Sequence, residues 1–204
     1  INSSLNRSLM RRLNEWKVAS GEPILTILNI TEFRSTEGKP DFERLRSNPT
    51  LDEALRVLIG SCIVCMALLK PSRDDELTHL KRSCLREDAG GYWINFSLGK
   101  SNAREVWQDE ERPIPIIAAK AIHFLQRLGI GLSTQLAEKR KIGDNLFYLP
   151  RTAGNGALDA TGGLLNKHLD IFCDFVGLPP DFEGQRWYVR IHEMRKWFLL
   201  LLFW

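Results

Sequence analysis

Hydrophobic residues recur every three to four positions in several stretches of the chain, which is the spacing of helices that bury one face. Residues 1–16 show this pattern with arginines between the apolar positions, so an amphipathic helix is predicted there. Residues 23–30 form a β-branched apolar run that fits a short strand or a helical turn. Residues 33–49 are polar and contain Gly38 and Pro40, so they are interpreted as a connection.

A helix start signal marks the next element. Thr50 is followed three residues later by Glu53, which is the spacing of a capping box. The apolar run behind this pair predicts a helix to Leu69, and Pro71 cannot continue it. A second, short helix is expected to begin near Ser72.

Aromatic and β-branched residues then replace the helical period, which indicates short strands. Three strands are predicted, at residues 85–88, 92–96 and 112–117. Helical spacing returns at residues 118–128, 132–141, 164–176 and 191–204, with Gly129 ending the first of these helices, a glycine-rich loop at 151–163 and a turn at 177–184. The predicted fold class is mainly α with a small three-stranded antiparallel sheet, that is, α+β.

The chain of 204 residues suits one large domain with a leading segment. Residues 1–49 are predicted to be an N-terminal helix and linker, and residues 50–204 the main domain. Two apolar runs, residues 54–69 and 197–204, fall short of the roughly 20 residues that span a bilayer. Both are therefore interpreted as buried helices, and no membrane partner is expected.

The charge of the chain permits nucleic-acid binding without requiring it, because the net charge is +3 and the pI about 8.7. If DNA is the partner, the basic residues must be concentrated on one face. The chain opens with polar and basic residues rather than a signal peptide, and its four cysteines are expected to be free thiols. A reduced, cytoplasmic setting is therefore expected.

Three separated pieces carry candidate chemistry. An Arg-x-x-Glu-Leu motif begins at Arg73, just after an apolar helix. Lys100 follows the second predicted strand, ahead of an Arg-Pro-Ile-Pro stretch that begins at Arg112. A His-x-x-Arg motif runs from His192 to Arg195 at the start of the last helix.

In this order, with these predicted helices and strands between them, the three pieces resemble the catalytic domain of the tyrosine recombinase, or phage integrase, family. The resemblance extends from Thr50 to the end of the chain. It implies that Arg73 and Arg195 are the two catalytic arginines, with Lys100 the lysine of the β-hairpin and His192 the histidine. The implied activity is site-specific DNA recombination or integration through a 3′-phosphotyrosyl intermediate, as in phages and mobile elements.

These residue types suit attack on a phosphodiester. Two guanidinium groups can grip the non-bridging oxygens of the phosphate and strengthen their hold as its charge grows. A histidine can take a proton from the nucleophile near neutral pH, and a lysine beside two arginines can protonate the leaving 5′ oxygen. Glu76, one helical turn beyond Arg73, could orient the arginine's guanidinium. The chemistry requires neither a metal nor another cofactor.

The family's nucleophile is a tyrosine a few tens of residues beyond the His-x-x-Arg motif. The chain's tyrosines, Tyr92, Tyr148 and Tyr188, all precede Arg195. We therefore expect the nucleophile to lie beyond Trp204, in a C-terminal part that these residues do not include, and expect the 204 residues alone to be inactive.

The resemblance also implies partners. Such enzymes act on duplex DNA as dimers or tetramers that assemble on paired sites, and residues 1–49 could be the remnant of a DNA-clamping module. The basic residues expected to contact the DNA backbone are Lys81, Arg82, Lys139, Arg140 and Lys141.

Other interpretations remain open from the residues. A type IB topoisomerase shares the same catalytic residue types, and a non-catalytic DNA-binding relative would explain the missing tyrosine. Each charged residue of the motifs could also be an ordinary surface charge. Cys62 and Cys65 lie in an apolar helix without a second pair at metal spacing, so core packing is expected. The residues after His192 lack the second histidine of a zinc-protease motif, and no metal site is predicted.

Overall fold

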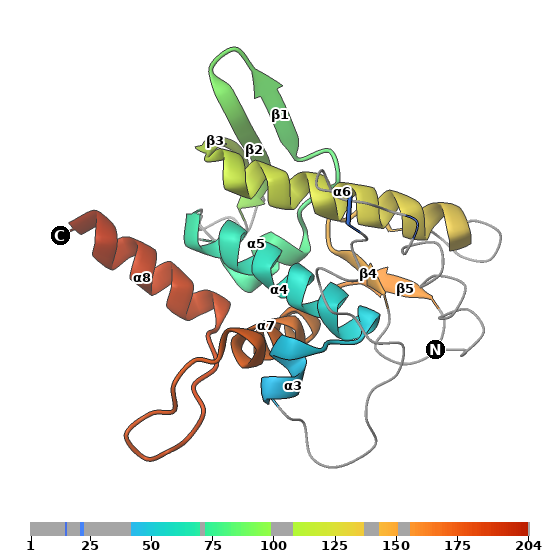
Figure 1. Ribbon diagram of the computed structural model, residues 1–204. Coiled ribbons are helices and arrows are strands. Elements are labelled where there is room, and N and C mark those ends of the chain that lie inside the picture. Colours follow the sequence, from blue (N-terminus) through green and yellow to red (C-terminus); the bar gives the residue numbers. More distant parts are fainter. Residues whose placement is uncertain are drawn as a thin grey trace. The chain divides into compact units, whose positions relative to one another are not determined.

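A computed structural model of the protein describes residues 15, 21–22, 42–69, 72–98, 108–136, 143–150 and 156–203 (Figure 1). The helices among them are α3 (Phe42–Ser47), α4 (Leu51–Leu69), α5 (Asp74–Thr78), α6 (Ile116–Leu136), α7 (Gly162–Val176) and α8 (Ile191–Phe203). The strands are β1 (Leu85–Asp88), β2 (Gly91–Leu98), β3 (Gln108–Ile114), β4 (Tyr148–Pro150) and β5 (Ala157–Asp159). The mixed α and β class is confirmed. Apart from Glu15, the predicted helix at 1–16 lies outside the described residues, as does the run at 23–30.

The three-stranded sheet has the order β1-β2-β3, and both strand pairs are antiparallel, as predicted. β3, however, ends at Ile114, whereas the sequence predicted a strand over residues 112–117. The reason is that α6 begins at Ile116, where the carbonyl of Pro115 accepts the backbone N–H of Ala118 at 2.9 Å. Proline suits a helix start because its fixed φ is already helical and it has no N–H to leave unpaired.

β3 also begins earlier than predicted, at Gln108. Its first five residues are polar or charged, so they carry no apolar strand signal. The guanidinium of Arg86 on β1 donates to Glu111, with Nε 2.6 Å from Oε1. Hydrogen bonds from Arg86 lower the pKa of the Glu111 carboxyl. An ion pair between the two outer strands therefore supports this exposed part of the sheet.

α6 is one helix from Ile116 to Leu136, so the prediction of a helix end at Gly129 and a new helix over residues 132–141 is wrong for the described part. A Cβ added to Gly129 would lie 3.2 Å from Cδ of Arg82. Gly129 is therefore explained by the close approach of another side chain. Residues 137–142 lie outside the described residues.

Part of the glycine-rich loop predicted at residues 151–163 is a strand, which corrects that prediction. β5 pairs antiparallel with β4, and the backbone N–H of Ala160 donates to the carbonyl of Phe147 at 2.8 Å. α7 then begins at Gly162, two residues before the predicted helix. Strands of three residues are too short to show the alternation by which strands are recognised in a sequence. Leu149 is wholly buried, so this hairpin belongs to the core.

The described residues group into two compact units. One unit combines the residues up to Leu58 with Asp170–Tyr188, and the other combines Ile59–Leu169 with Val189–Trp204. The domain boundary predicted before Thr50 falls inside the first unit. The Arg-x-x-Glu-Leu and His-x-x-Arg motifs both belong to the second unit.

The core of the second unit forms where three helices meet the three-stranded sheet. A small apolar gap there is lined by Met66 of α4, Leu77 of α5, Ile94 of β2, Ile114 of β3, and Ala118 and Ile122 of α6. Leu77 and Ile122 have no exposed surface. Burying such side chains stabilises each by roughly 2 kcal/mol. The short helix α5 is therefore held against the sheet by its leucine.

A buried ion pair organises the first unit around the start of α4. The predicted capping box is confirmed: the backbone N–H of Thr50 donates to Oε2 of Glu53 at 2.9 Å, and the N–H of Glu53 donates to Oγ1 of Thr50 at 3.3 Å. Arg44 also donates to Oε1 of Glu53 at 2.7 Å. Arg44 lies on α3, a helix inside the segment predicted as a connection, so that prediction is corrected here. Six residues are too few for a helical period to stand out.

Glu53 makes the stability of this unit dependent on pH. Burial raises the pKa of its carboxyl, but hydrogen bonds from Arg44 and Thr50 outweigh burial and leave the pKa below its ordinary value of 4.5. Because the folded pKa is the lower one, the stabilisation is present above pH 4.5 and is lost as the pH falls through the folded pKa. Glu53→Gln should therefore cost about 2 kcal/mol at pH 7, and this cost should shrink towards pH 3.

Chemical denaturation at both pH values measures this difference. The matched control is Asp52→Asn in the same helical turn, whose exposed pair with Arg56 should contribute less than about 0.5 kcal/mol. An equal cost at pH 7 and pH 3 would show that the charge of Glu53 is not what stabilises the unit.

Candidate active site

Arg73 is the N-cap of α5, with extended backbone angles of φ −86° and ψ 161°. Its backbone N–H donates to Oε2 of Glu76 at 3.0 Å, and its carbonyl accepts the N–H of Leu77 at 3.1 Å. Arg73 is exposed, whereas Glu76 and Leu77 are buried. The first turn of α5 thus fixes the main chain of Arg73 and leaves its side chain at the surface.

Glu76 was predicted to orient the guanidinium of Arg73. The structure shows a hydrogen bond from the main-chain N–H of Arg73 to the Glu76 carboxylate. Since only 6% of Glu76 is exposed, its carboxylate is buried and needs this hydrogen bond. Glu76 therefore positions the arginine by holding its backbone.

His192 and Arg195 lie on the first two turns of α8, whose start is also capped by a glutamate. The backbone N–H of Arg190 donates to Oε2 of Glu193 at 2.9 Å, three residues further on. Ile191 and Met194 anchor the helix, because they are 1% and 2% exposed. His192 is exposed and Arg195 half-buried, so the motif residues lie off the buried stripe of the helix.

Lys100 lies outside the described residues, in the segment 99–107 that connects β2 to β3. The strand ends on either side are described: Leu98 pairs with Gln108 at the end of the ladder. The predicted hairpin that carries Lys100 is therefore confirmed in its two strands.

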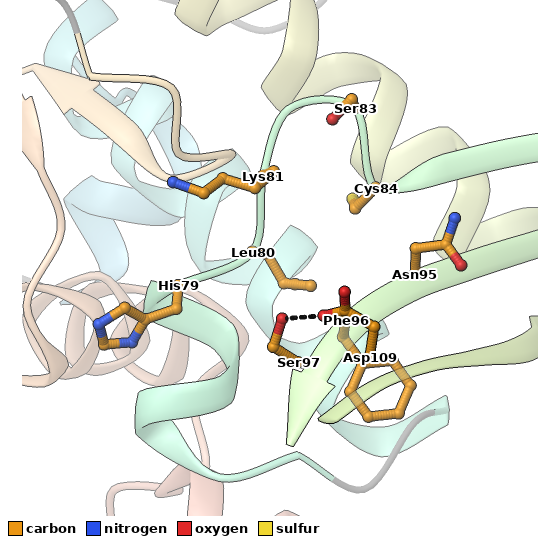
Figure 2. Close-up of a pocket in the computed structure, with 9 residues that line it drawn as sticks. All are labelled: His79, Leu80, Lys81, Ser83, Cys84, Asn95, Phe96, Ser97 and Asp109. Atoms are coloured by element: carbon orange, nitrogen blue, oxygen red, sulfur yellow. Dashed lines mark hydrogen bonds between the residues drawn. The ribbon is translucent and has the colours of Figure 1, made fainter. Parts of the chain in front are cut away.

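A cavity of about 360 Å³ lies beside this end of the sheet (Figure 2). It is lined by His79, Leu80, Lys81, Ser83, Cys84, Asn95, Phe96, Ser97 and Asp109. Figure 2 shows His79 and Lys81 on one side of it and Asn95 on the other. Ser97 donates to Oδ1 of Asp109 at 2.6 Å, across the two strands that lead to Lys100. Its size lies in the usual range of ligand sites, roughly 300 to 1,000 Å³.

Most of the polar residues of this cavity were not singled out in the sequence. They come from the segment after α5 and from two different strands, so no local spacing connects them. The only prediction that falls on the cavity is Lys81. Its Nζ donates to Oδ1 of Asn145 at 3.0 Å, and its side chain is at the surface. A lysine in this position can also reach a DNA phosphate.

Arg82, the other predicted DNA contact in this segment, is engaged within the protein. Its Nη1 donates to Oγ of Ser133 at 3.1 Å, and its Nη2 donates to the carbonyl of Gly143. Its guanidinium also lies 5.7 Å from the ring centre of Tyr148. These contacts favour a structural role for Arg82. The predicted cluster of Lys139, Arg140 and Lys141 lies outside the described residues.

One of the three tyrosines is buried, and the other two have raised pKa values. Tyr148 is 4% exposed and lies under Arg82. Burial raises the pKa of Tyr188, and the neighbouring Asp174 raises it further. A hydrogen bond to Glu87 likewise raises the pKa of Tyr92. Tyr92 and Tyr188 therefore lack the lowered pKa that is one way of activating a nucleophile, although each lies beside a carboxylate.

No protein-family model and no curated protein matches this chain. The resemblance to the tyrosine recombinases therefore rests on the sequence motifs alone.

Cys62 and Cys65 of α4 form no disulfide. Burial raises the pKa of the Cys62 thiol to about 12, which fits the predicted role of these cysteines in packing. Among the residues that the structure describes, no cluster of His, Cys, Asp and Glu could hold a metal ion. Within the same residues, no helix has both the length and the apolar character needed to cross a membrane.

Proposed function

We propose that this protein breaks and rejoins DNA as a site-specific recombinase of the tyrosine type, with a catalytic domain of the corresponding fold. The observation that carries the proposal is that two helices of one compact unit carry the motif arginines near starts of similar construction. α5 and α8 are each capped by a glutamate, through Arg73–Glu76 and Arg190–Glu193; Arg73 is the N-cap of α5, and Arg195 lies in the second turn of α8. The sheet with the Lys100 hairpin lies between them in the sequence.

Each motif residue has a role in this chemistry. Arg73 and Arg195 hold the scissile phosphate and stabilise the charge that grows on its oxygens. His192 takes the proton of the attacking tyrosine, whose oxygen bonds to phosphorus while the bond to the 5′ oxygen breaks. Lys100 protonates that 5′ oxygen. A 5′ hydroxyl then reverses the step, so the phosphodiester is re-formed without a metal or cofactor.

The nucleophile in this proposal is a tyrosine beyond Arg195 and Trp204, because Tyr92, Tyr148 and Tyr188 all precede the His-x-x-Arg motif that the family's nucleophile follows. The partners are duplex DNA and further copies of the protein assembled on paired sites. Lys81 is proposed to contact the DNA backbone from the rim of the cavity.

A second candidate function is a DNA-binding protein without catalysis on the same scaffold. The observation that favours it is that Tyr92, Tyr148 and Tyr188 all precede Arg195. The presence of both motif arginines, together with the motif lysine and histidine, favours catalysis.

Covalent trapping distinguishes the two functions. The protein is expressed from its complete gene, and its binding site is first selected from a pool of random duplexes. A nick placed within the selected site lets the short cleaved strand diffuse away, so the covalent intermediate accumulates. We expect a DNA-linked band on a denaturing gel, and mass spectrometry should map the link to a tyrosine beyond Arg195. Tight binding to the selected duplex without any adduct would instead establish the non-catalytic binder.

A further inference from the structure

Residues 177–190 connect α7 to α8, and Figure 1 shows this connection as a long loop. Residues 179–187 of this loop, called the finger below, include the aromatic residue Phe182. Phe182 has a relative exposure of 111%, the largest among the exposed apolar residues that the structure describes. The backbone around Phe182 is held by hydrogen bonds. Oδ1 of Asp181 accepts the backbone N–H groups of Glu183, at 2.9 Å, and of Gln185, at 2.8 Å. The turn that carries Phe182 is therefore closed by its own hydrogen bonds.

The base of the finger is fixed as well. Arg186 donates to Oδ1 of Asp174 on α7 at 2.6 Å, with side-chain exposures of 22% and 20%. Pro180 forms a β-bridge with Arg186, and Gly184 takes the positive φ of 76° that closes the turn. An aromatic residue held in this way loses little conformational entropy when it binds, which is what characterises anchor residues of interfaces.

The charges beside Phe182 indicate what kind of surface it can meet. Asp181 and Glu183 flank it on both sides along the chain. Two carboxylates would approach the phosphates of a DNA duplex if Phe182 inserted between bases, and that repulsion disfavours a nucleic-acid partner. An apolar protein surface with a basic rim is complementary to this tip.

The second half of α8 has this character. Leu200 and Leu201 lie one turn beyond Trp197, and the three are 55%, 70% and 54% exposed respectively. Lys196 precedes them at the surface of the same helix, whereas the carboxylate of Glu193 is directed to the helix start, where it caps the backbone. The exposed apolar face of α8 is thus bordered by a positive charge.

We propose that the finger of one molecule docks on the apolar face of α8 in a second copy of the chain. Phe182 packs against Trp197 and Leu201, and Glu183 faces Lys196. Because the two surfaces differ, one such contact is head-to-tail, and it leaves the pair with one free finger and one free α8 face for further copies. The inference does not depend on the recombinase chemistry, since it requires no DNA and no cleavage.

Sedimentation of the purified chain without DNA tests the contact. The wild-type protein should self-associate with a dissociation constant in the micromolar range, as expected of a small interface. Phe182→Ala should weaken this association at least about tenfold. The matched control is Ile130→Ala on α6, which removes an apolar side chain of 57% exposure that belongs to neither surface and should leave association unchanged.

A charge exchange identifies the pairing. Glu183→Lys and Lys196→Glu should each weaken association about fivefold, and the double variant should return to within about twofold of the wild type. Lys120→Glu, an exposed lysine of α6, controls for the change in net charge. Thermal melts of each variant check that the fold is kept, which the exposure of these side chains predicts.

Three results would overturn the inference. The first is a wild-type chain that stays monomeric up to about 100 µM, well above micromolar dissociation constants. The second is a Phe182→Ala variant that associates like the wild type, and if it then binds duplex DNA more weakly, the finger contacts DNA instead. The third is a double charge variant that associates no better than the single ones. None of these results bears on covalent trapping with DNA.

Discussion

Replacing Arg73 with alanine should slow DNA cleavage by about a thousandfold while weakening DNA binding only slightly. The effect is large because the arginine is proposed to contact the phosphate oxygens most strongly when their charge is greatest, at the transition state. Arg73 can be replaced without removing its bond to Glu76, because that bond comes from the backbone N–H and not from the side chain. The fold should therefore survive the substitution.

The measurement is the rate of covalent adduct formation on the nicked duplex, together with binding by gel shift. Arg73→Lys keeps the charge but loses the planar fork, so it should recover only a small part of the rate. Arg127→Ala removes an exposed arginine of α6 and is the matched control, with wild-type cleavage expected. Cleavage at the wild-type rate by Arg73→Ala would contradict the recombinase mechanism.

The parts of the fold that the sequence predicted are those specified by neighbouring residues. The start of α4 is a local event, because Thr50 and Glu53 exchange hydrogen bonds across three positions. β1 has the predicted bounds for a similar reason, since Ala89 and Gly90 directly follow it and lead into β2, which begins at Gly91. Such signals lie within a few residues of the element that they define.

The parts that it did not predict depend on residues far away in the chain. Gly129 looks like a helix end until Arg82 is seen against it, 47 positions earlier by residue number. The short strands β4 and β5 are stabilised by the burial of Leu149 in the core, and their sequences show no alternation of apolar and polar residues. The cavity beside β2 joins several segments, so its residues share no spacing. The same limit applies to the candidate site, where the motifs were visible but the role of Glu76 in holding the main chain was not.

Arg82 is the clearest example of a residue whose role depends on distant parts of the chain, and that role leads to a prediction about stability. In the sequence it stands beside Lys81 as a second candidate for the DNA backbone. In the structure its guanidinium is bonded to Ser133 and Gly143, which lie 51 and 61 residues away. On its main chain, Arg82 donates to the carbonyl of Asp144 at 2.9 Å and accepts from Gln126 at 2.6 Å.

Arg82→Ala should therefore lower the free energy of unfolding by about 3 kcal/mol, because two hydrogen bonds from a charged group and a ring contact are lost. The melting temperature should fall by roughly 10 °C. Lys81→Ala, its neighbour, is the matched control and should leave stability unchanged within about 0.5 kcal/mol.

The expected effects on DNA binding are the reverse of those on stability: DNA binding should depend on Lys81 and not on Arg82. If Lys81 neutralises one phosphate, its loss should reduce the slope of binding affinity against salt concentration by about one, whereas Arg82→Ala should leave the slope as it is. Binding is to be measured at a temperature where both variants are folded. A stable Arg82→Ala protein with a reduced salt slope would show that this arginine leaves Ser133 and Gly143 to bind DNA. A destabilised Arg82→Ala protein with an unchanged salt slope would show that Arg82 is a structural residue that joins α6 to the segment following α5.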